Sequence, residues 1–225
     1  MTKVLLLGIG NLLWADEGFG VRVIETLLKN YSFPENITVL DGGTQGVYLV
    51  QHVQESDVLI VFDAIDFDLP AGSLKLIHNE DVPNFMGAKK MSLHQTGFQE
   101  VLAMAQLLGD YPQHLLLIGV QPVELDDYGG SLRPQVKAQI QPAIDCALQY
   151  LAQFTLYPQP LEANASVTLS DPMLDMQRYE TQRPSELEAC RLGDERVVYS
   201  PHVKIIAPES SEGAIPIDVD FRGQY

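Results

Sequence analysis

Two carboxylates and one imidazole, Glu17, Asp63 and His94, are the residues whose types and spacing point to chemistry. Oxygen and imidazole donors in this combination suit zinc, nickel or another borderline divalent ion, and three protein ligands leave positions open for water or substrate. The start of a helix also disfavours the charged form of a histidine such as His94, and metals bind the neutral form. The three residues together therefore predict a divalent metal site.

The elements that must position these residues are strands and helices of an open sheet. Glu17 follows an expected strand over residues 3–9, Asp63 closes an expected strand over 57–63, and His94 lies in the first turn of an expected helix over 92–108. Open α/β sheets bind their ligands beyond the carboxyl ends of parallel strands. We therefore expect the three side chains to converge above that edge.

Each residue also has an interpretation without function. Taken singly, Glu17 is better explained as an acid favoured in the first turn of a helix, and Asp63 is explained equally well as the cap of a turn through an Asx hydrogen bond. His94 taken alone is typical of a surface histidine. Only their joint placement at strand and helix ends favours a site.

The hydrophobic pattern predicts a doubly wound α/β domain with a mostly parallel five-stranded sheet and helices on both faces. Buried runs and one alternating run give the expected strands 3–9, 36–41, 57–63, 73–77 and 114–120. Helical spacing gives the expected helices 18–30, a short helix after residue 46, 92–108 and 134–154, with a kink at Pro142. The segment 78–91 is expected to be a loop.

The composition changes near residue 156. Half of the 14 prolines follow this point, many acids accompany them, and no long periodic helix is visible. We therefore expect an α/β domain over residues 1–155 and an acidic, proline-rich extension over 156–225, loosely ordered or with short edge strands at 196–199, 203–206 and 215–221.

Charge and composition narrow the partners. The formal net charge is -16, which repels nucleic-acid backbones and anionic membranes. The two cysteines, Cys146 and Cys190, form no CxxC pair, and neither a signal peptide nor an apolar run long enough to span a membrane is visible. We expect a cytoplasmic monomer, without membrane insertion, that acts on a small molecule, a metal or a protein.

A dinucleotide site is the rival interpretation of the first loop. Gly8-Ile9-Gly10 follows a strand, and Asp41 stands where a ribose-binding acid would lie. The third glycine of that fingerprint is replaced by Leu13, and the adjacent acids Asp16 and Glu17 oppose a pyrophosphate. We therefore expect no nucleotide cofactor.

Four ordered motifs resemble the signature of the nickel-iron hydrogenase maturation endopeptidases, and the resemblance covers roughly residues 1–155. They are GIGNLLWADEGFG at 8–20, DGGTQG at 41–46, VFDA at 61–64 and SLHQTG at 92–97. The resemblance implies a protease that removes a short C-terminal extension from the hydrogenase large-subunit precursor after nickel has been loaded.

The resemblance also implies roles for individual residues. Glu17, Asp63 and His94 match the family's metal-binding positions. They would sense another divalent metal or the nickel that is supplied by the large-subunit precursor, the client of the protease. Water would be activated either by Asp63 or Glu17 or by the bound metal, and the sequence leaves this choice open. The turn Asp41, Gly42, Gly43 and Thr44 is expected to hold the client's extended tail by backbone contacts.

A second hypothesis from a different class stays open. The same fold and motifs are compatible with a non-catalytic nickel-sensing or client-holding factor, which would bind the client without shortening it. The extension over 156–225 departs from the family pattern, and we leave docking of the large subunit, contact with another factor and solubility alone as its alternative roles.

Overall fold

Five strands of one sheet carry the framework of the protein. The computed structural model describes residues 1–86, 93–161 and 174–182. The strands lie in the order β3-β1-β4-β6-β5, and all neighbours pair in parallel except β5 and β6. Their bounds are β1 (Val4–Ile9), β3 (Ile37–Gly43), β4 (Val58–Ala64), β5 (Leu74–His78) and β6 (His114–Val120). The prediction of a mostly parallel five-stranded sheet is confirmed.

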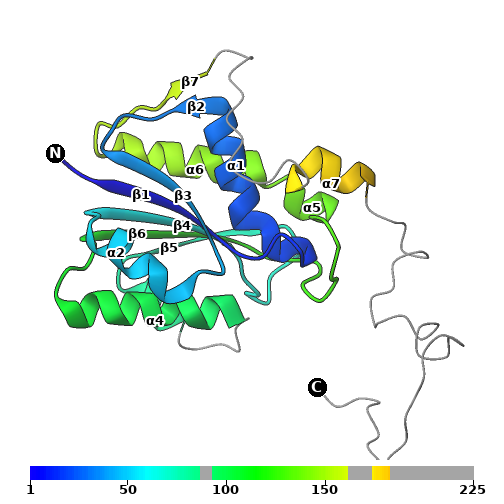
Figure 1. Ribbon diagram of the computed structural model, residues 1–225, viewed down its shortest axis with the longest axis horizontal. Helices are drawn as coiled ribbons and strands as arrows, with labels where there is room; N and C mark the ends of the chain where they lie inside the picture. Colours follow the sequence, from blue (N-terminus) through cyan, green and yellow to red (C-terminus); the bar gives the residue numbers. More distant parts are fainter. Residues whose placement is uncertain (87–92, 162–173, 183–225) are drawn as a thin grey trace, which may run out of the picture. The chain divides into compact units, whose positions relative to one another are not determined.

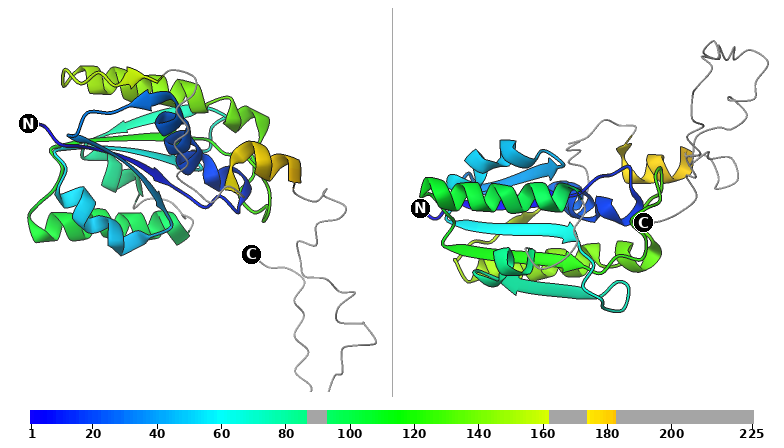
Figure 2. Two further views of the ribbon diagram at one scale, coloured as in Figure 1. Left: turned by 45° about the horizontal axis from the view of Figure 1, so that its top comes forward. Right: turned by 90° about the horizontal axis from the view of Figure 1, so that it is seen from below.

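Helices cover both faces of this sheet, as Figures 1 and 2 show. On one face lie α1 (Phe19–Asn30) and α6 (Ile140–Ala152), and on the other α2 (Val50–Gln54) and α4 (Leu93–Leu108). Because successive side chains of a strand point to opposite faces, Leu6 of β1 packs in the core on the side of α1 and α6, and Leu5 packs in the core on the side of α2 and α4. The apolar run of β4 is buried throughout, since helices cover it from both sides.

The antiparallel strand β5 follows from a short connection. Residues 65–73 join β4 to β5 and contain no helix, and parallel neighbours need a longer crossover. The chain therefore returns in the opposite direction and pairs with β6 at the edge, where β5 keeps a half-exposed pattern.

Two local predictions in this part of the chain were incomplete. The segment expected as a loop contains α3 (Asp81–Met86). Val82 of this helix is buried in the core on the side of α2 and α4, and this burial favours the helix. The expected helix over 134–154 is two helices, α5 (Pro134–Lys137) and α6. Pro142 lies in the first turn of α6, where backbone N–H groups lack intrahelical partners, and the interruption between α5 and α6 comes directly before this turn.

The chain divides into two compact units, Met1–Ala189 and Cys190–Tyr225. The second unit, and with it the three expected edge strands, lies outside the described residues. Two elements beyond residue 155 belong to the first unit: β7 (Gln159–Pro160), which pairs antiparallel with β2 (Tyr31–Ser32), and α7 (Met176–Gln182). The boundary expected at residues 155 and 156 stays a prediction.

None of the helices in the described ranges combines the length and apolar content that a membrane crossing requires.

Candidate functional site

The first turn of α1 lies directly on the backbone of the sheet. A Cβ atom on Gly20 would fall 2.1 Å from the Phe62 carbonyl oxygen, and one on Gly10, at a φ of +134°, would fall 1.8 Å from that of Glu17. Only glycine permits such approaches. These glycines are therefore explained by backbone packing, which brings the start of α1 and the preceding helix η1 (Ala15–Gly18) to the carboxyl end of β4.

This packing places the two predicted carboxylates at the same edge of the sheet. Glu17 lies half-buried in η1, and its N–H donates to the Trp14 carbonyl at 2.8 Å. Asp63 is the penultimate residue of β4 and only 1% exposed, and its Oδ1 accepts the N–H of Ala64 at 2.8 Å. Since η1 packs against β4, Glu17 and Asp63 come from adjacent elements, although they are 46 positions apart in the sequence.

The segment 41–44, expected as a turn after a strand that ends at Asp41, is instead the end of β3, which runs to Gly43, together with the next residue, and it lies at the same edge. Asp41 pairs in register with Gly8 of β1, and Gly43, with a φ of +45°, pairs with Ile9, so that Gly42 is an inserted residue of a bulge. The Gly10 N–H donates to the Gly43 carbonyl at 3.1 Å, which ties the turn to the first loop.

The Asp41 carboxyl has a perturbed environment. Burial raises its pKa above the ordinary value because it disfavours the charged form, and the negative charge of Glu25 raises the pKa further. The Gly43 N–H and the positive charge of Arg22 oppose this rise. Thr44, at the end of the turn, is exposed.

The helix that carries His94 starts beside this turn. A Cβ atom on Gly97 would lie 3.7 Å from the Cα of Gly46, the first residue of η2 (Gly46–Leu49), and α4 packs along η2. His94 is the second residue of α4, but its side chain falls outside the described part of the chain. Among the side chains that the structure describes, no three His, Cys, Asp or Glu residues are grouped as a metal site would require. The Glu17, Asp63 and His94 set stays a prediction.

Sequence reasoning missed the role of Asp16. This side chain is fully buried and accepts three backbone N–H bonds: Oδ2 from Val123 at 2.8 Å and Glu124 at 2.9 Å, and Oδ1 from Arg133 at 2.7 Å. Asp16 therefore holds the loop after β6 and the start of α5 against the loop that carries Glu17. Its place beside Glu17 in the motif gave a signal, but its partners lie over 100 residues away.

Gln121 is a second residue that the sequence did not single out. Its Oε1 accepts the N–H groups of Phe67 at 2.7 Å and Leu69 at 3.1 Å, and its Nε2 donates to Asp66 at 3.0 Å. Buried after β6, it fixes the loop that follows Asp63.

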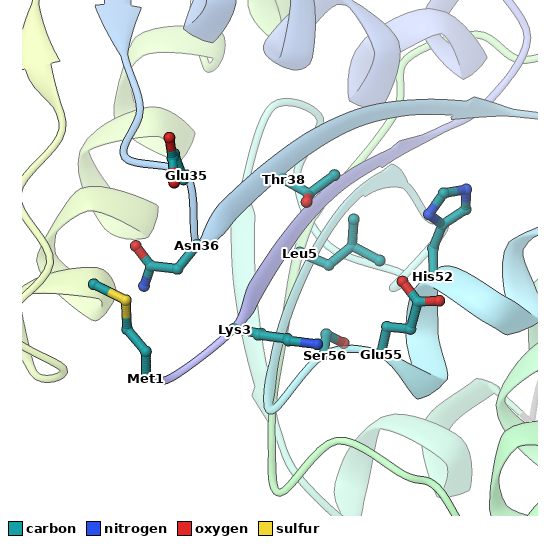
Figure 3. Close-up of a pocket in the computed structure, with 9 residues that line it drawn as sticks. All are labelled: Met1, Lys3, Leu5, Glu35, Asn36, Thr38, His52, Glu55 and Ser56. Carbon is teal, nitrogen blue, oxygen red and sulfur yellow. The ribbon is translucent and has the colours of Figure 1, made fainter.

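A cavity of about 390 Å³ lies at the opposite end of the sheet (Figure 3). It is lined by Met1, Lys3, Leu5, Glu35, Asn36, Thr38, His52, Glu55 and Ser56. Its walls come from the amino ends of β1 and β3 and from α2, whereas open α/β sheets bind ligands at the carboxyl ends. We therefore place the candidate site at the carboxyl edge and not in this cavity.

Known proteins resemble the chain over most of its length. The family model of the hydrogenase maturation proteases (HycI) matches residues 21–150. The hydrogenase expression/formation protein HupD of Thiocapsa roseopersicina is 58% identical over 213 residues, which are 94% of this chain and 96% of that protein. The hydrogenase 2 maturation protease of Escherichia coli is 38% identical over 162 residues, which are 72% of this chain and 98% of that protein.

The fold agrees with these likenesses. The solved structure of the hydrogenase maturating endopeptidase HybD from E. coli matches with a TM-score of 0.67 and 36% identity, over 71% of this chain and 98% of that one. The match of family, sequence and fold shows that this chain belongs to the hydrogenase maturation protease family and is an endopeptidase.

Proposed function

We propose that this endopeptidase removes a C-terminal extension from the nickel-loaded large-subunit precursor of a nickel-iron hydrogenase, here called the client. The observation that carries the proposal is the placement of Glu17 and Asp63 on two elements that pack together at the carboxyl edge, in a chain of this family. The names of the relatives, which include a hydrogenase 2 maturation protease, support a hydrogenase as the client.

The donor set supports recognition of nickel carried by the client. Two carboxylates and an imidazole suit a borderline divalent ion such as nickel, and Asp63 is held almost without exposure at the end of β4. In this proposal Glu17, Asp63 and His94 contact the client's nickel, so that a client without the metal is not cleaved. Nickel is then part of the substrate.

Hydrolysis of the extension needs an activated water molecule. A carboxylate takes a proton from water as a general base, and a divalent ion lowers the pKa of water bound to it towards about 7. Asp63 and Glu17 are our candidates for the base. The attack on the scissile carbonyl carbon then releases the extension as a free peptide and leaves a new carboxyl terminus on the client.

The turn at Asp41, Gly42, Gly43 and Thr44 is our candidate for holding the client's tail. Asp41, Gly42 and Gly43 are the last residues of β3, an edge strand of the sheet, and extended peptides commonly bind to such edges through main-chain hydrogen bonds. The turn is also tied to the first loop through Gly10 and Gly43.

Incubation with a nickel-loaded, uncleaved client tests the proposal. Intact mass spectrometry should show the client shortened by a C-terminal peptide, and a client without nickel should stay intact. Asp63→Asn, Glu17→Gln and His94→Ala should each lower the rate by about 100-fold or more, as expected for loss of a base or ligand. Glu35→Gln, an exposed glutamate at the opposite end of the sheet, is the matched control and should retain wild-type activity.

Two outcomes would contradict the proposal. Binding without any change in the client's mass would indicate a non-catalytic nickel-sensing or client-holding factor. Unchanged cleavage in all three site variants would show that the reaction takes place elsewhere on the chain.

We also propose that the protein acts in the cytoplasm as a monomer. The net charge of -16 supports a monomer because like charges oppose self-association. Light scattering of the purified protein and fractionation of cells test the two parts separately.

A further inference from the structure

Two loops at the carboxyl edge form a single rigid unit. Asp16 accepts the N–H groups of Val123 and Glu124 through its side chain, and its own N–H donates to the Glu124 carbonyl at 3.1 Å. The Gly129 N–H donates to the Leu13 carbonyl at 2.7 Å. The loop after β1 and the loop after β6 are therefore held together at two places.

This unit presents apolar side chains to solvent. Trp14 and Tyr128 form an isolated antiparallel bridge, and their rings meet edge to face with centroids 5.2 Å apart. Tyr128 is 51% exposed, Val123 45% and Leu13 38%, while Trp14 is half-buried. We call these four residues, Leu13, Trp14, Val123 and Tyr128, the aromatic rim.

The backbone beneath the aromatic rim is fixed before any partner binds. Ala15 is buried and has a φ of +34°, a backbone conformation that residues other than glycine rarely adopt. The N–H of Trp14 donates to the Asn11 carbonyl at 3.1 Å, and that of Leu13 to the Asn11 side chain at 3.0 Å. Binding to exposed aromatic side chains on such a loop therefore orders few additional groups.

The aromatic rim borders the proposed cleavage site. Trp14 precedes Glu17 by three residues, and η1, which carries Glu17, packs against β4. An extended peptide advances about 3.3 Å per residue, so client residues a few positions from the scissile bond come within reach of Trp14 and Tyr128.

We propose that the aromatic rim is an apolar subsite for the client segment next to the scissile bond, and that it takes aliphatic or aromatic side chains of that segment. This inference rests on the proposed function and adds a binding determinant to it. Exposed, preorganised aromatic residues are the usual energetic centres of protein interfaces. Glu124 follows Val123 directly and the exposed Asp126 lies in the same loop, so these charges disfavour an acidic side chain of the occupant there.

To test the proposal, we would measure Kd, KM and kcat of variants of the aromatic rim with the nickel-loaded client. Tyr128→Ala and Val123→Ser should each weaken binding of the client and raise KM, by about tenfold for Tyr128→Ala, with kcat changed less than about twofold. Tyr128→Phe should bind as the wild type does, because the ring and not the hydroxyl makes the contact. Tyr157→Ala removes a ring that is 61% exposed beyond α6, and this matched control should leave Kd and KM unchanged.

Thermal unfolding of each variant separates a binding effect from a folding effect, and Val123→Ser keeps the test available if Tyr128→Ala does not fold. Unchanged Kd and KM in both variants would overturn the aromatic rim as a subsite. A wild-type protein that binds the client without cleaving it would contradict the proposed function, while the ratio of Kd values would still test the subsite. A dimer that Tyr128→Ala converts to a monomer would instead assign this surface to a second copy of the chain, and would overturn the proposal.

Discussion

Asp16 shows how one carboxylate joins parts of the chain that are far apart in sequence. It lies beside Glu17 in the first motif but accepts backbone N–H groups from Val123, Glu124 and Arg133. A carboxylate has acceptor positions on both oxygens and no donor, so it satisfies all three N–H groups at once. Its function is to position the loops around the candidate site.

Replacement of Asp16 by Asn tests this role. An Asn side chain has one acceptor oxygen and one NH₂ group, so in either orientation the NH₂ group meets at least one backbone N–H. We expect Asp16→Asn to lower the free energy of unfolding by about 2–3 kcal/mol, measured by urea denaturation. Asp126→Asn, at an exposed position of the loop after β6, should change it by less than about 0.5 kcal/mol. Equal effects of the two substitutions would contradict the role of Asp16.

The raised pKa of Asp41 predicts a pH dependence of stability. Because burial and the charge of Glu25 raise this pKa, the folded protein binds more protons than the unfolded chain above the ordinary Asp value. The stability that this group contributes is present at low pH and is lost as the pH rises through the folded pKa. Relative to Asp41→Asn, the wild type should therefore lose free energy of unfolding as the pH rises from about 4 towards neutrality.

Urea denaturation of both proteins at several pH values between about 4 and 7 measures this difference. Asp110→Asn, an exposed substitution after α4, provides the matched control. Parallel pH curves for the wild type and Asp41→Asn would refute the assignment.

At the scale of elements, the segment that ends in α7 is attached to α1 and α5 by polar contacts. The buried Arg22 of α1 donates hydrogen bonds to the Glu25 carboxylate at 2.8 Å and to the Leu174 carbonyl at 2.6 Å. The guanidinium carbon of Arg22 lies 6.0 Å from the centroid of the Tyr179 ring in α7. Glu180 of α7 forms an ion pair with Lys137 of α5, with 2.8 Å between Oε2 and Nζ. As Figure 1 shows, α7 lies beside α5 at the end of the molecule where β1 runs into η1 and α1.

The contacts of Arg22 predict that its replacement lowers the free energy of unfolding strongly. Arg22→Ala removes the buried ion pair between Arg22 and Glu25, and should lower the free energy of unfolding by about 3–5 kcal/mol. The double variant Arg22→Met with Glu25→Leu should cost less, because no buried charge is left behind. Lys29→Ala removes the exposed pair with Asp175 and should cost less than about 1 kcal/mol. Similar losses for Arg22→Ala and Lys29→Ala would argue against a buried pair at Arg22.

At the scale of the whole molecule, the acidic charge and the glycine packing both oppose a nucleotide. The net charge is -16, and Gly10 and Gly20 bring the backbones of the first loop, α1 and β4 together. A saturating dinucleotide should therefore leave the midpoint of thermal unfolding unchanged, whereas a true ligand at 100 times its Kd stabilises by about 2.7 kcal/mol. A concentration-dependent rise in Tm with the dinucleotide would restore the rival interpretation.

The sequence by itself determined the strands, most helices and the positions of the candidate residues at their ends. The run Val58–Ala64 is apolar up to Asp63, and such local patterns set the direction and burial of a strand wherever it is placed. The motifs around Glu17, Asp41, Asp63 and His94 are likewise readable without coordinates because they are continuous in the chain.

Only the tertiary structure decided how these elements meet. The strand order, the antiparallel β5, the contact of η1 with β4 and the bonds of Asp16 join residues that are distant in sequence. The pairing of Trp14 with Tyr128 and the contact of Arg22 with Leu174 are of the same kind. Local periodicity says which side of an element is buried but not which partner buries it, because that choice depends on the packing and chain closure of the whole fold.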